Sequence, residues 1–108
     1  MKAVTTLFAL SFLSITASAA DLCTKYENKP RYMKAIETVA KYQQYTMEEF
    51  CSHPRVLDIE VQPSQVINNK GEVIPHMSVQ QHFSYDSCLY MVNETDYSIT
   101  RARCYSGE

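Results

Sequence analysis

The clearest repeating pattern in this chain lies between Arg31 and Gln43. Apolar or amphipathic side chains recur there every three or four residues, with charged and polar residues between them; the stripe comprises Tyr32, Met33, Ile36, Val39, Ala40 and Gln43. This spacing gathers the stripe on one face of a helix. Pro30 suits the first turn, where the missing N–H of proline leaves no hydrogen bond unmade. The pattern therefore predicts an amphipathic helix that begins at about Pro30.

A second helix-start signal follows within the same stretch. Thr46 is followed three residues later by Glu49, which is the spacing of a capping box, and Tyr45 and Phe50 flank it as a hydrophobic staple would. The helix is therefore expected either to kink near Tyr45 or to end there, with a short second helix running to about Ser52. Pro54 stops this segment, because the residue before a proline avoids helical backbone.

The rest of the chain alternates with the period of two that is typical of strands. Two alternating runs flank an Asn-Asn-Lys-Gly turn signal; their apolar or amphipathic positions are Leu57, Ile59 and Val61, then Met77, Val79, Gln81, Phe83 and Tyr85. A three-residue loop from Asn69 to Gly71 places Val61 opposite Val79 and Leu57 opposite Phe83, and it puts glycine at the left-handed position. Shorter or longer loops set these residues opposite Ser78 and His82. We therefore predict a hairpin in the first register.

A second hairpin is predicted near the C-terminus. Its strands are Cys88 to Val92 and Tyr97 to Tyr105, with the turn between them. With a three-residue loop, one face of this hairpin collects Leu89, Met91, Tyr97, Ile99, Arg101, Arg103 and Tyr105. Tyrosine, arginine and methionine are enriched at protein interfaces. This face is our candidate binding surface if the helix covers the other one; the alternative is that it lies under the helix with its arginines at the margin. The small residues of the opposite face, such as Ala102, favour the binding interpretation.

These elements predict an α+β fold. An N-terminal amphipathic helix, either kinked or divided into two, packs on a four-stranded antiparallel meander sheet.

The first twenty residues have the composition of a signal peptide. Lys2 precedes an apolar stretch from about Leu7 to Ile15, and small residues lead up to Ala20. We expect cleavage after Ala19 or Ala20, no membrane span afterwards, and one small domain at 21–108. The protein is then periplasmic or secreted.

An even number of cysteines in a short exported chain predicts two disulfides among Cys23, Cys51, Cys88 and Cys104. All three pairings are open. If the helix breaks at Tyr45, the chain can return far enough to favour Cys23–Cys51 with Cys88–Cys104. In the predicted register, however, Cys104 lies two residues beyond the position opposite Cys88.

Other chemistry finds little support in the residues. The net charge of −2 comes without a basic stripe, which argues against nucleic-acid binding, and two glycines are too few for a phosphate-binding loop. His76 and His82 would lie roughly 20 Å apart on one strand, so the histidines are expected to be ordinary surface residues. We expect neither a metal nor a cofactor. Asp58 and Glu60 share a strand face, as paired catalytic carboxylates would, although a solvated face explains them as well.

These observations favour an exported, non-enzymatic protein-binding module, such as a periplasmic inhibitor or a toxin-neutralising immunity protein, whose partner is an unidentified protein. Two alternatives remain. One is a small exported hydrolase that uses Asp58, Glu60 or a histidine. The other is a structural or colonisation factor that self-associates, for instance as a homodimer, through the hairpin face or an edge strand.

Overall fold

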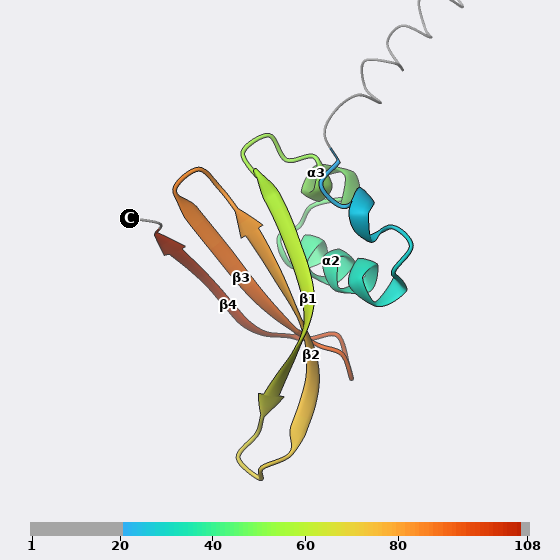
Figure 1. The fold of residues 1–108 in the computed structure, drawn as a ribbon, viewed down its shortest axis with the longest axis vertical. Helices are drawn as coiled ribbons and strands as arrows, with labels where there is room; N and C mark the ends of the chain where they lie inside the picture. The colour runs from blue at the N-terminus through green and yellow to red at the C-terminus, as the bar shows by residue number, and fades with distance from the viewer. Residues whose placement is uncertain (1–20, 107–108) are drawn as a thin grey trace, which may run out of the picture.

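The computed structural model describes residues 21–106, and the predicted signal peptide lies outside this range. Helical segments come first and a four-stranded sheet follows, so the predicted α+β fold is confirmed (Figure 1). The elements are η1 (Thr24–Tyr26), α2 (Pro30–Tyr42), α3 (Met47–Cys51), β1 (Asp58–Ile67), β2 (Val73–His82), β3 (Asp86–Asn93) and β4 (Ile99–Ser106).

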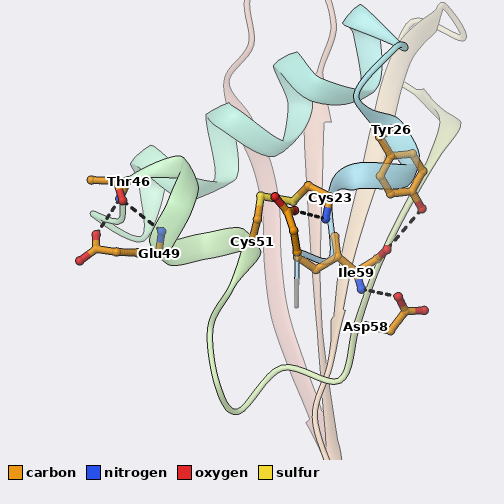
Figure 2. Close-up of a disulfide and its surroundings, with 8 residues drawn as sticks. Cys23, Tyr26, Thr46, Glu49, Cys51, Asp58 and Ile59 are labelled. Carbon is orange, nitrogen blue, oxygen red and sulfur yellow. Dashed lines mark hydrogen bonds between the residues drawn. A yellow bond between two sulfur atoms is a disulfide. The ribbon is translucent and has the colours of Figure 1, made fainter. Parts of the chain in front are cut away.

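The helical part forms two helices and not one kinked helix. Helix α2 begins at Pro30 as predicted. It ends because Gln44 adopts left-handed backbone, with φ of 66°, which lets the N–H of Tyr45 donate to the carbonyl of Ala40 at 2.8 Å. This is the C-terminal arrangement that glycine usually completes. Helix α3 then starts at the predicted capping box, in which Thr46 and Glu49 exchange both hydrogen bonds (Figure 2).

The sheet is an antiparallel meander with strand order β1-β2-β3-β4. Strands β1 and β2 pair with Val61 opposite Val79, which is the predicted register. Gly71 has a φ of 80° in the connecting turn, the left-handed conformation that glycine adopts without a steric penalty. Leu57 precedes β1 and is exposed, so the predicted Leu57–Phe83 pair lies outside the strand pairing.

The core lies between the helices and one face of the sheet. Ile36 and Val39 of α2 and Phe50 of α3 are fully buried there. Each sheet strand adjoining them contributes alternate residues, and the buried sheet side chains include Ile59, Val61, Met77, Val79, Cys88, Tyr90 and Val92. Removing one such side chain from water contributes about 1.5–3 kcal/mol. The helices therefore cover the face that carries Val92, and they leave the face that carries Met91 bare.

The pairing of β3 with β4 differs from the prediction. Cys88 stands directly opposite Cys104, whereas the predicted register put them two residues out of line. A bulge makes up part of the difference, because Met91 pairs with Arg101 but Val92 pairs with Ile99, and Thr100 is the extra residue. The turn consequently leaves Ile99 on the face that the helices cover.

Both disulfides have the favoured pairing. Cys23 is bonded to Cys51, and Cys88 is bonded to Cys104. The first bridge lies within the helical layer (Figure 2), and the second links the neighbouring strands β3 and β4. None of the helices within residues 21–106 combines the length and the apolar character needed to cross a membrane.

Candidate functional site

The sheet face turned away from the helices is the candidate site, and we call it the open face. Register places its residues in three rows across the sheet; they are Gln62, Ser78, Met91 and Arg101, then Glu60, Gln80, Leu89 and Arg103, and finally Asp58, His82, Ser87 and Tyr105. Leu89 and Met91 are half-buried at its centre, while both arginines are exposed. The open face therefore has an apolar middle with charged and aromatic side chains along β4.

Not all of the predicted binding residues reach this face. Leu89, Met91, Arg101, Arg103 and Tyr105 share it, because they alternate along β3 and β4 in the observed register. Tyr97 and Ile99 do not, and both pack against the core on the helix side. The bulge reverses the alternation before Arg101, so the simple period of two fails at this turn.

Tyr97 has a different role from the one its position in the sequence suggested. Its backbone is left-handed, with φ of 56°, an uncommon conformation for a bulky residue. The ammonium group of Lys34 lies 5.3 Å from the centre of its ring. Tyr97 thus connects the β3–β4 turn to α2 through its contact with Lys34.

Within residues 21–106, the arginines of the open face form no ion pair with a carboxylate. The ion pairs found between residues 21 and 106 involve Lys25, Lys34, Arg31 and His82 as the basic members. The guanidinium of Arg103 instead lies 5.8 Å from the ring centre of Tyr105. Glu60, the carboxylate on the opposite side of this face, already contacts His82. The β4 side of the open face is therefore positively charged and available to an acidic ligand.

A line of catalytic residue types also crosses the open face. His82 places Nε2 2.5 Å from Oε1 of Glu60 and Nδ1 3.1 Å from the hydroxyl of Ser87. Serine hydrolases combine such a triad with donors for an oxyanion and with a concave substrate site. Ser87 lies on a strand paired on both sides, which engages the neighbouring backbone N–H groups. None of the three residues lines the groove between the α2–α3 connection and the β2–β3 turn, which is described below. Within residues 21–106, strand pairing thus engages the backbone N–H groups beside Ser87 that could otherwise bind an oxyanion.

The other histidine of the predicted strand is buried, contrary to the expectation of a surface position. His76 is only 1% exposed. Its Nε2 lies 2.9 Å from the hydroxyl of Thr100, the residue that the bulge adds to β4, and its Nδ1 lies 3.0 Å from the carbonyl of Ile74. The ring thus fills a structural position beneath the bulge.

A groove of about 830 Å³ was not anticipated from the sequence. It opens where the α2–α3 connection faces the β2–β3 turn, and its lining includes Tyr45, Tyr85 and the Cys88–Cys104 bridge. Gln43 also lines it and donates to Gln81 at 2.8 Å and to the Tyr90 hydroxyl at 2.7 Å. The lining residues come from three strands and three connections that are far apart in the sequence, so no local motif could have revealed the groove.

One group of metal-ligand residue types occurs in the described part of the chain, and its atoms are already engaged. Asp21 lies close to Cys23 and Cys51. Both sulfur atoms belong to the disulfide, and the Asp21 carboxylate accepts the backbone N–H of Cys23 at 2.9 Å. The carboxylate therefore stabilises the turn before η1.

No protein-family model matches this chain, and no match was found among the curated proteins or the solved structures.

Proposed function

We propose that this chain is an exported, non-enzymatic protein-binding module that acts by covering a partner protein with its open face. A periplasmic or secreted inhibitor, or an immunity protein that neutralises a toxin, would act in this way. One observation carries the proposal: Arg101, Arg103 and Tyr105 project from an exposed strand beside half-buried Leu89 and Met91, on a sheet face that the helices leave bare.

The chemistry of this face suits a protein partner. An apolar centre gains free energy when a partner excludes water from it, and arginine and tyrosine are the residue types that dominate binding energy in such contacts. Because Arg101 and Arg103 form no ion pair with a carboxylate among residues 21–106, a partner would not have to displace such a pair there. Charge-assisted hydrogen bonds to the guanidinium groups would add to the affinity.

Export is part of the same proposal. Two disulfides in so short a chain fit an oxidising compartment, where such bonds form and persist. The signal-peptide composition of the first twenty residues would direct the chain to export. Mass spectrometry of the protein recovered from its native host is expected to find a chain that begins at Ala20 or Asp21. A protein that retains Met1, or has four free thiols, would contradict export.

The binding surface can be tested by reversing its charge. The double variant Arg101→Glu/Arg103→Glu keeps exposed side chains at both positions, and Lys70→Glu makes a charge reversal at the exposed turn between β1 and β2, away from the open face (Figure 1). Site-specific cross-linking in the native host is expected to capture the same partner with the wild type and Lys70→Glu.

The double variant should bind that partner at least 30-fold more weakly, because two interface residues worth about 1–2 kcal/mol each would be replaced by repelling ones. Equal melting temperatures would show that the fold is intact. If all three proteins capture the partner equally well, the open face is not the binding surface.

A further inference from the structure

Strands β1 and β4 form the two edges of the sheet, and hydrogen bonds occupy part of the β1 edge. The N–H of Val61 donates to the Tyr26 hydroxyl at 2.9 Å, and that hydroxyl lies 3.3 Å from the carbonyl oxygen of Ile59. The N–H of Ile59 donates to the Asp58 carboxylate at 2.9 Å (Figure 2). Farther along the strand, Pro63 has no N–H at all. The outward N–H groups of residues 59, 61 and 63 are thus occupied or missing, which hinders another strand from pairing along this part of β1.

Strand β4 forms the other edge, and its backbone is open. The Cα atoms of Cys88 and Cys104 are 3.9 Å apart, which identifies the closely spaced, non-hydrogen-bonded kind of antiparallel pair. Cys104 and Ala102 therefore direct their N–H and carbonyl groups away from β3. Among residues 21–106, the hydrogen bonds outside regular strand pairing include none to these groups.

The side chains of β4 leave room beside this edge. Ala102 and Cys104 point to the helix side, where one is a methyl group and the other is held in the disulfide. Arg101 and Arg103 point to the open face, one residue away on either side of Ala102. An incoming strand would thus meet small side chains on one face and, on the other, two positive charges that form no ion pair within residues 21–106.

We propose that β4 accepts an extended segment of the partner protein as a fifth strand, and that this segment carries acidic side chains at alternate positions. This inference rests on the proposed function and specifies the part of the partner that is recognised. The N–H and carbonyl groups of Ala102 and Cys104 supply the backbone hydrogen bonds, which give affinity in strand addition. Arg101 and Arg103 select the acidic side chains, which would lie beside them as cross-strand neighbours.

A second copy of this chain fits the edge poorly. Pairing β4 with β4 would bring Arg101 and Arg103 against the same residues of the other copy, and like charges on neighbouring strands destabilise a sheet. Pairing β4 with residues 59–63 of β1 is hindered because the outward N–H groups there are occupied or missing. A partner strand with acidic side chains would instead place opposite charges beside Arg101 and Arg103, which is favourable.

A short peptide tests the geometry directly. The probe is acetyl-Thr-Glu-Val-Glu-Val-Glu-Thr-amide, added to the full mature protein, and the measurement is amide hydrogen exchange by NMR. Binding is expected to slow exchange at Ala102 and Cys104 at least tenfold. Exchange at Val61, whose N–H is already bonded, should stay the same.

Two control peptides separate backbone pairing from charge alone. One has lysine in place of glutamate, and the other has N-methyl groups on the valines, which block strand pairing but keep the charge. Both are expected to bind at least tenfold more weakly. Unchanged exchange at Ala102 and Cys104 with saturating peptide, or equal binding of the N-methylated peptide, would overturn the inference.

A variant distinguishes failure of this inference from failure of the proposed function. Ala102→Pro removes an N–H that points away from β3, so the β3–β4 pairing is kept, and Ala102→Ser is the matched control. Loss of the native partner with proline but not with serine supports strand addition. If the proline variant keeps the partner while Arg101→Glu/Arg103→Glu loses it, the open face binds and strand addition is wrong. If the proline variant does not fold, the exchange measurement on the wild type decides.

Discussion

The Tyr26 hydroxyl offers a precise test of how the β1 edge is stabilised. Replacing Tyr26 by phenylalanine removes one oxygen atom and leaves the ring, which is 9% exposed and stacks on Tyr32 with 5.6 Å between ring centres. The backbone N–H of Val61 then loses its acceptor, and the carbonyl of Ile59 loses its neighbour. Any loss of stability therefore reports on these two hydrogen bonds and not on packing.

The expected loss follows from the burial of the groups involved. Val61 is 5% exposed and Ile59 is fully buried, so water can replace the hydroxyl only in part. A buried donor left without an acceptor costs about 1–3 kcal/mol. The second bond is long and adds little. We expect Tyr26→Phe to lower the free energy of unfolding by about 2 kcal/mol, which is a fall of roughly 10 °C in melting temperature for a domain of this size.

Tyr32→Phe is the matched control. Tyr32 is the stacking partner, and no hydrogen bond of its hydroxyl is found within residues 21–106. Urea denaturation with both disulfides intact should show the control within about 0.5 kcal/mol of the wild type. Amide exchange at Val61 should become faster in Tyr26→Phe alone. If both variants are equally stable, the hydroxyl does not stabilise the strand edge.

Further predictions concern separate parts of the fold. Gln44→Gly should raise stability by about 0.5–1 kcal/mol, because glycine adopts the left-handed backbone without steric strain; a lower urea midpoint would contradict this. The hydrogen bonds from Arg31 hold the pKa of Glu94 below its ordinary value of 4.5, so their stabilisation is present above that pH and disappears as the pH falls through the lower, folded-state pKa. Glu94→Gln should accordingly be about 0.5–1 kcal/mol less stable than the wild type at pH 7, with a gap that closes in acid; a gap of constant size would exclude the carboxylate as its source. Replacing Cys88 and Cys104 by alanine should cost about 3 kcal/mol, given their separation of 16 residues, and a loss below 1 kcal/mol in urea denaturation would show that the unfolded chain gains little freedom.

Local sequence signals predicted the parts of the fold that depend on neighbours along the chain. The capping box at Thr46 gave the start of α3, because both of its hydrogen bonds form within four residues. The β1–β2 register followed from matching apolar faces, since a shift by one residue would expose Val61 and Val79. The same reasoning could not decide between one kinked helix and two helices. Nothing in the sequence marks Gln44 as a residue with left-handed backbone.

The second hairpin shows where this reasoning fails. The bulge adds one residue to β4, Thr100, and so interrupts the alternation of faces. Thr100 is held there because its hydroxyl contacts the buried ring of His76. That contact joins positions 24 residues apart and leaves no local signal. Five of the seven predicted binding residues therefore share one face of β3 and β4, while Tyr97 and Ile99 were assigned to the wrong face.

The contact of Tyr26 with the edge of β1 could not be predicted from the sequence for a related reason. Tyr26 reads as an ordinary aromatic residue in a polar segment, and its hydroxyl meets β1 only after the chain has folded back over 33 residues or more. The line of Glu60, His82 and Ser87 likewise arises from three strands. Such groupings depend on register, which the alternation of residues determines only when no bulge intervenes.

The two disulfides divide the molecule in a way that affects how it comes apart. Cys23–Cys51 closes the helical layer on itself, Cys88–Cys104 closes the C-terminal hairpin, and neither bridge joins one layer to the other. When the chain is pulled from its ends, the helices can therefore peel from the sheet while both closed loops survive. The two bridges span separations of 28 and 16 residues, and these segments would not extend. The fully stretched molecule would therefore be shorter than an unbridged chain with the same number of residues. The difference is the contour length of the two closed loops.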